Sequence, residues 1–266
     1  MTLTVAAALG LAAGLHGAVY GAYKDSPHES FLLRRFVREL VIALVCAVGL
    51  VVLFSAAREQ SLFIFYLTVF ALTRIVTELW KLFIRVEPQD GYRIPTQMHR
   101  VNGVVTTPWI RWALGIGFLA SIQGIWALCT MLPDEWPAAV KGLLTGLAIG
   151  TGEAIAGGYK DGSIEGFHWL KFFKSPTFGA IGGLVASGHV ENVHQPFLFL
   201  ASIGTMRMLL ELLFKMVRPD YAPGKFPSMV GRFTEWTERR RHFLTPYAMT
   251  WLLYMVLCSH PSWRVP

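Results

Sequence analysis

Charged side chains are scarce in this sequence. Lys, Arg, Asp and Glu make up 15% of its 266 residues, whereas a typical soluble domain carries about 25%. Hydrophobic residues account for 53% of the chain, and the mean hydropathy is +0.45. The shortage of charge excludes a soluble globular enzyme as the first interpretation. The abundance of hydrophobic residues excludes an intrinsically disordered chain.

Cysteines and familiar catalytic motifs are also lacking. The three cysteines, Cys46, Cys129 and Cys258, provide neither a disulfide framework nor the spacing of a metal site. The sequence contains no phosphate loop, no dinucleotide-binding fingerprint, no nucleophile elbow and no acidic cluster of the CDP-alcohol type. We therefore expect no metal and no cofactor, and the sequence singles out no catalytic residue.

Long apolar runs take the place of these features. A helix needs about 20 apolar residues to cross the ~30 Å hydrocarbon core of a bilayer. The runs are continuous rather than alternating, which favours helices over the strands of a membrane barrel. They predict an all-α polytopic membrane protein with eight transmembrane helices, at 3–22, 39–56, 61–84, 108–131, 138–158, 176–190, 196–217 and 243–259.

Lysines and arginines are distributed unevenly among the predicted loops. With eight spans, the loops after the first, third, fifth and seventh spans lie on one side and hold 19 of the 24 basic residues. The opposite side holds Arg58, Lys141 and Arg264, while Arg74 and Arg207 lie inside spans. By the positive-inside rule, both termini are outside and the basic loops are inside. The net charge of +7 then reflects topology, and no nucleic-acid partner is expected.

The chain also contains an internal duplication. Residues 14–36, GLHGAVYGAYKDSPHESFLLRRF, resemble residues 150–172, GTGEAIAGGYKDGSIEGFHWLKF, at an offset of 136. Residues 72–85, LTRIVTELWKLFIR, resemble residues 205–218, TMRMLLELLFKMVR, at an offset of 133. Because each half holds four predicted spans, both halves insert the same way up. We expect a pseudo-two-fold axis along the membrane normal, with repeats at 1–131 and 132–266.

Several polar residues recur in both copies, near the inner ends of the predicted spans. Arg and Glu four residues apart share one helix face, so we expect Arg74 to pair with Glu78, or with an acid of the neighbouring segment. Ion pairs that fasten each half together, a vestibule that attracts phosphate groups or small anions, and a catalytic carboxylate pair are all open interpretations. The recurring residues are Lys24, Asp25, Glu29, Arg74 and Glu78 in the first half, and Lys160, Asp161, Glu165, Arg207 and Glu211 in the second.

Each half also carries one titratable residue deep in its first span, at neighbouring rather than identical positions. His16 corresponds to Gly152, and Glu153 corresponds to Gly17. Intramembrane ionisable groups often mark proton or ion pathways. We therefore treat His16 and Glu153 as candidates for proton or ion coupling, facing each other across the axis. A buried hydrogen-bonded pair without such a role is the alternative.

Together these features predict an integral membrane transporter or channel with a basic, cytoplasm-side vestibule for anions or phosphate-bearing lipids. One alternative is a structural or accessory subunit of a larger membrane complex. The other is a membrane-embedded enzyme acting on a lipid head group. The expected partners are membrane lipids, including anionic ones, together with a second copy of the chain or other membrane subunits. The charge rule applies equally to a plasma (inner) membrane and to an organelle inner membrane.

Overall fold

Long helices dominate the computed structural model, which describes residues 1–88, 100–101, 104–189, 194–213, 232–260 and 263. The predicted all-α class is confirmed. The strands β1 (Arg100–Val101) and β2 (Val104–Val105) form only a small antiparallel pair. The helices are α1 (Leu3–Glu29), α2 (Leu33–Leu53), α3 (Ser55–Glu59), α4 (Leu62–Leu79), the π-helical η1 (Trp80–Ile84), α5 (Pro108–Thr130), α6 (Ala138–Glu165), α7 (Trp169–Ser187), α8 (Gln195–Glu211), α9 (Thr234–Arg239), the 3-10 helix η3 (Arg240–Phe243) and α10 (Leu244–Ser259).

Within the described ranges, four helical segments are long and apolar enough to cross a membrane: Leu3–Glu29, Leu33–Leu53, Leu62–Ile84 and Pro108–Thr130. They indicate a membrane-embedded protein. A helix also occupies each of the other four predicted segments, although residues 214–217 lie outside the described part. Two of those helices, α8 and α10, have 17 and 16 residues and are shorter than the ~20 residues that a full crossing needs.

The helix starts follow local capping chemistry. The hydroxyl of Ser61 accepts a hydrogen bond from the Ile64 N–H at 3.3 Å before α4, and Thr107 caps α5 with Pro108 in the first turn. Such caps satisfy backbone N–H groups that have no partner inside the helix. The last long helix, α10, begins at Leu244, one residue after the predicted start at residue 243, and η3 runs directly into it.

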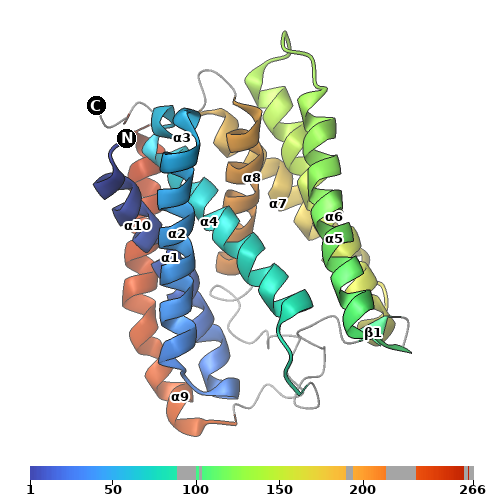
Figure 1. Ribbon diagram of the computed structural model, residues 1–266. Helices are drawn as coiled ribbons and strands as arrows, with labels where there is room; N and C mark the ends of the chain where they lie inside the picture. Colours follow the sequence, from blue (N-terminus) through green and yellow to red (C-terminus); the bar gives the residue numbers. More distant parts are fainter. Residues whose placement is uncertain (89–99, 102–103, 190–193, 214–231, 261–262, 264–266) are drawn as a thin grey trace.

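The core is built around α4. Its residues Phe63–Ala71 are consecutively buried, whereas α5 exposes most of its side chains. A helix that is buried all round lies inside a bundle, and an exposed apolar helix such as α5 suits contact with lipid. The α4 helix packs against α8, where an added Cβ at Gly204 would meet the backbone of Leu67. These two helices therefore form the centre of the bundle (Figure 1).

Small residues allow the closest helix contacts. In α1, an added Cβ at Gly10 would lie 2.6 Å from the Ala47 Cβ of α2. Between α6 and α7 the backbones themselves touch, because a Cβ at Gly146 would meet backbone atoms of Gly179 and Gly183 at 3.0 Å or less. Such small-residue stripes let helices approach closely in membranes.

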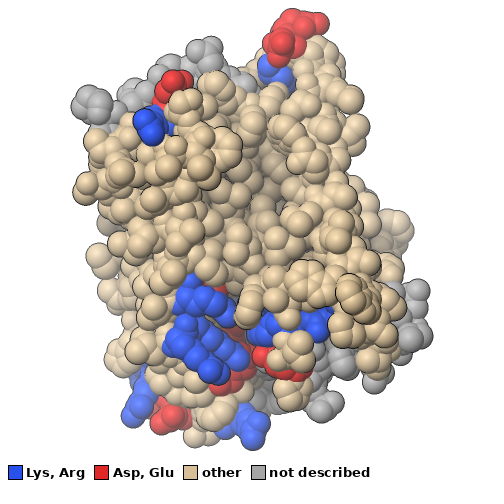
Figure 2. Space-filling view, viewed as in Figure 1, with Lys and Arg blue, Asp and Glu red and all other residues tan. Residues whose placement is uncertain are grey.

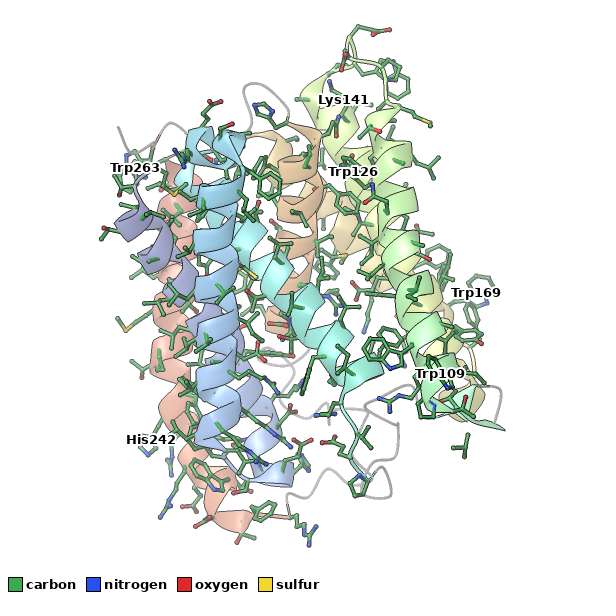
Figure 3. The ribbon with its side chains drawn as sticks, viewed as in Figure 1. Trp109, Trp126, Lys141, Trp169, His242 and Trp263 are labelled. Carbon is green, nitrogen blue, oxygen red and sulfur yellow. The ribbon has the colours of Figure 1, made fainter. Side chains whose placement is uncertain are left out.

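The two ends of the bundle carry different features. The N-terminal ammonium donates to the Arg58 carbonyl, and Trp263 accepts from Leu62 N–H, so these residues share one end. We call it the outer end, after the predicted topology, and we call the opposite end, which carries α9 and β1, the inner end (Figure 1). Trp126, Lys141 and Trp263 lie toward the outer end in Figure 3, and Trp109 and His242 lie toward the inner end.

Candidate functional site

Charged side chains gather at the inner end of the visible face, below a broad band of uncharged residues (Figure 2). Its central members are Arg74 and Glu78 of α4 and Glu211 of α8, and α4 contacts both α8 and α1 in the middle of the molecule. Because charges inside a membrane are costly unless they are paired or hydrated, the contacts of these side chains decide what the region can do.

Arg74 of α4 lies at the centre of the buried charges. One of its terminal nitrogens, Nη2, is 3.4 Å from Glu211 Oε1 of α8 and 3.8 Å from Glu78 Oε1, one turn further along α4. Lys81 Nζ lies 2.5 Å from the same Glu78 oxygen. The side chains of Arg74 and Glu211 are 16% and 7% exposed, respectively. A chain of alternating charges thus runs from the buried Glu211 to Lys81 at the inner end.

The matching arginine of the second half is more open. Arg207 Nη1 lies 3.1 Å from Glu153 Oε1 of α6, and the two side chains are 32% and 24% exposed. Arg74 therefore joins one half of the chain to the other, whereas Arg207 pairs with an acid of its own half. The recurrence of the two arginines in the sequence predicted neither their different exposure nor their different choice of partner.

His16 is completely buried in the middle of α1. Its Nδ1 lies 2.9 Å from Thr250 Oγ1 of α10, and its Nε2 lies 4.0 Å from Glu211 Oε2. The rings of Phe70, Tyr247 and Trp251 surround the imidazole, with centroids 5.0–5.8 Å away. The site therefore holds one histidine in a largely aromatic environment with a single carboxylate beside it.

The expected approach of His16 to Glu153 does not occur. His16 lies beside Glu211, and Glu153 forms its ion pair with Arg207. The physical reason is the packing of the helices: α1 contacts α4 and α10, whereas α6 contacts α7, α8 and α5. The two first helices of the halves thus present their ionisable groups to different neighbours.

The remaining residues of the first-half set lie at the inner end of α1. Lys24 Nζ is 3.5 Å from Asp25 Oδ1 and sits 5.2 Å from the centre of the Tyr20 ring. Glu29 forms an ion pair with Arg35 of α2. Each of these contacts fastens the end of α1 to itself or to the start of α2.

The corresponding residues of the second half are described only in part. Lys160, Asp161 and Glu165 belong to the last turns of α6, but their side chains lie outside the described part of the structure. Their predicted pairing and their predicted role in binding phosphate groups therefore stay predictions.

Sequence reasoning missed Glu39 and Thr250. Glu39 of α2 is buried, accepts a hydrogen bond from the Thr77 hydroxyl at 3.1 Å, and receives Arg38 at 3.2 Å. Because its counterpart in the second half is Ser175, a comparison of the two repeats passes over it. A lone acid at the start of the apolar run 39–56 was the available signal. Thr250 carried no signal, since only the fold brings it to His16.

The chemistry open to this arrangement is limited. No group of three or more potential metal ligands occurs among the residues that the structure describes. The side chains can hold opposite charges together, bind an anion at an arginine that exchanges its carboxylate partner, or bind a proton. No family model, curated protein or solved structure matches the chain, so the functional argument rests on this geometry.

Proposed function

We propose that the protein is an integral membrane transporter with eight spans in two parallel four-helix repeats, 1–131 and 132–266. The inner ends of the helices form a vestibule for small anions or phosphate-bearing lipid head groups. In this topology both termini are on the outer side, in a plasma (inner) membrane or an organelle inner membrane. The lipids of that membrane are the first expected partners.

Helix boundaries that recur at the repeat offset support the two repeats. The α1 helix ends at Glu29 and α6 ends at Glu165, and both ends are 136 residues apart in the sequence. The next residues, Ser30 and Gly166, both have a positive φ, of 64° and 74°. These are the positive-φ residues within the described ranges, so an unusual backbone conformation recurs at equivalent positions.

The helix contacts support the same arrangement, because they also come in equivalent pairs. The α1–α2 contact corresponds to α6–α7, and α1–α4 corresponds to α6–α8. The fourth helices are exchanged between halves, since α10 packs on α1 and α5 packs on α6. The α4–α8 contact lies where the two halves meet. A two-fold axis through this contact would relate every one of these pairs.

The single observation that carries the transport proposal is the matched pair of arginines within α4 and α8. An arginine stays charged in a protein, so one inside a membrane helix needs a counter-charge or water. Arg74 is sealed between Glu78 and Glu211, whereas the Arg207 side chain is one-third exposed. We assign Arg207 as the group that receives an anion or phosphate, in exchange for its contact with Glu153.

Flux measurements on reconstituted protein test this function. We expect proteoliposomes to move chloride, inorganic phosphate or a fluorescent phospholipid faster than protein-free liposomes. Arg207→Gln is expected to reduce that flux by about tenfold or more, because it removes the charge that an anion would contact. Arg239→Gln, in an exposed ion pair of α9, serves as the control. Absence of flux for all three probes would contradict the proposal.

A structural subunit is the second candidate, and one observation favours it. Arg74, Lys24, Lys81 and Arg35 already hold carboxylate partners in the structure, as expected for charges that fasten a bundle. Gentle extraction followed by native mass spectrometry separates the candidates. Stoichiometric protein partners would favour the subunit, whereas a lone chain or homo-oligomer that retains a phospholipid or anion would favour the vestibule.

A further inference from the structure

The hydrogen bonds around His16 determine which of its nitrogens carries a proton. Thr250 donates its single hydroxyl proton to the Tyr247 carbonyl at 2.7 Å. The Thr250 oxygen can therefore only accept from His16 Nδ1, which lies 2.9 Å away. In a neutral imidazole with Nδ1 protonated, Nε2 is an acceptor. The fold thus directs a lone pair of Nε2 toward α8.

The atom that faces this lone pair is another acceptor. Glu211 Oε2 lies 4.0 Å from His16 Nε2, and both atoms are buried without a hydrogen-bond partner among the described residues. Two buried acceptors that face each other carry an unfavourable desolvation cost. One proton on either atom turns it into a donor, and an approach of about 1 Å then makes an ordinary hydrogen bond.

We propose that His16 and Glu211 together form a binding site for one proton, placed where the two halves of the chain meet. Its role as the coupling site of a transporter rests on the function proposed above. The proton comes from solvent and binds Nε2 of the imidazole or Oε2 of the carboxylate, so the pair gains one positive charge. The site replaces the predicted His16 and Glu153 pair.

The groups around the pair suit a site that changes charge. Tyr20, Tyr66 and Tyr247 are close enough to interact electrostatically with Glu211, and as neutral side chains they add no charge. Arg74 contacts the other carboxylate oxygen, Oε1, at 3.4 Å. Lys24, Arg207 and Glu39 act on Glu211 electrostatically. The unprotonated carboxylate is therefore neutralised chiefly by Arg74.

Proton binding would change the balance of charges at Arg74. A protonated pair no longer neutralises the guanidinium, which still faces Glu78 at 3.8 Å. Glu78 in turn is linked to Lys81 at the inner end. Arg74, Glu78 and Lys81 thereby connect proton uptake in the middle of α1 to the inner end. A coupled transporter requires such a link between proton binding and a change elsewhere in the protein.

The repeat equivalent of this site offers a natural control. Glu78 is the repeat counterpart of Glu211, but its neighbour is Lys81 rather than a histidine. The counterpart of His16 is Gly152. The chain therefore holds one such site among its described residues, and a variant of Glu78 reports what the loss of a buried carboxylate does in the absence of a facing imidazole.

The test is a titration of the whole protein in lipid nanodiscs. Nitrogen-15 NMR of labelled histidines, with His16→Gln for assignment, is combined with infrared spectroscopy of protonated carboxyl groups. We expect His16 to carry its proton on Nδ1 at high pH. Between about pH 8 and about pH 5, either the His16 Nε2 signal or the carboxyl band of Glu211 is expected to report uptake of a proton.

Variants then show whether the two groups act as one site. Glu211→Gln is expected to lower the proton affinity of His16 at least about tenfold, because it removes a facing negative charge while Arg74 stays. Glu78→Gln is expected to change that affinity less than about threefold. The wild-type titration alone decides the case if Glu211→Gln does not fold.

Two results would overturn the proposal: no change at either group over that pH range, or a His16 titration that is the same in wild type and Glu211→Gln. The outcome is separate from the transport test. If the pair titrates but chloride, phosphate and phospholipid show no flux, the proton site stands and the transport proposal is wrong. If flux occurs but the pair does not titrate, transport stands and the proton site is wrong.

Discussion

Arg74 and Arg207 occupy the same place in two similar segments of the chain, yet the structure surrounds them differently. Arg74 is buried between Glu78 and Glu211 and ties α4 to α8. Arg207 lies closer to the surface and contacts Glu153 of α6. The comparison teaches that a duplicated framework can bury one copy of a charge between two acids and leave the other copy paired with one acid and partly exposed.

The largest loss of stability is expected when Arg74, the more buried arginine, is neutralised. Arg74→Gln leaves the buried Glu211 without its counter-charge, since Glu78 keeps its contact with Lys81, and breaking a buried ion pair from one side costs about 3–5 kcal/mol. Arg207→Gln, in the more exposed copy, is expected to cost about 1 kcal/mol or less. Thermal unfolding of both variants in detergent measures the difference. Equal losses would show that burial does not distinguish the two arginines.

The glycine contacts come next. Gly146→Ala would force apart two backbones, because the new Cβ would meet backbone atoms of Gly179, and overpacking of this kind costs about 1–3 kcal/mol. The matching Gly10→Ala has the Ala47 methyl group as its nearest neighbour, and a side chain yields more easily than a backbone. The second half is therefore expected to lose more stability in the same unfolding measurement. A larger loss for Gly10→Ala would reverse this comparison.

Effects of opposite sign are expected at the two helix ends with positive φ. Ser30 has φ 64° and ψ 164°, a region that is essentially restricted to glycine, and Gly166 has φ 74° and ψ 178°. Ser30→Gly is expected to stabilise the protein by about 1 kcal/mol, since relief of strain exceeds the added flexibility of the unfolded chain. Gly166→Ala is expected to destabilise it by about 1–3 kcal/mol.

These two substitutions test the equivalence of the halves by the sign of their effects. An added Cβ at Gly166 meets no atom within 4 Å, so its cost reports the backbone conformation alone. Melting temperatures that move in opposite directions for Ser30→Gly and Gly166→Ala would support one shared loop geometry. A destabilising Ser30→Gly would contradict it.

Apolar runs located the helices well, and their ends less well. The predicted segment 108–131 became α5 at Pro108–Thr130, with Thr107 as its cap and Pro108 in its first turn. The predicted segment 138–158 became α6 at Ala138–Glu165, and α7 begins at Trp169 rather than at residue 176. Hydropathy reports where lipid surrounds a helix, whereas backbone hydrogen bonds continue into charged turns beyond it.

The candidate site was predictable only where the repeat was informative. Comparison of the two copies singled out Arg74, Glu78, Arg207 and Glu211, all of which form ion pairs in the structure. A repeat reveals equivalent residues but not contacts between copies, so the approach of Glu211 to Arg74 and His16 was not foreseen. Single polar residues such as Thr250 acquire a role only through packing.

The most direct test of the two parallel repeats is the sidedness of matched surface positions. Arg34 and Leu170 are 136 residues apart in the sequence, both are exposed near the starts of α2 and α7, and Leu170 is 90% exposed. Single cysteines at these positions, in a protein whose three native cysteines are replaced, are labelled with a membrane-impermeant maleimide in intact and opened vesicles. Asp134→Cys, between α5 and α6, marks the other side. We expect Arg34→Cys and Leu170→Cys to react from the same side and Asp134→Cys from the opposite side. Labelling of Arg34→Cys and Leu170→Cys from opposite sides would contradict the parallel repeats on which the account depends.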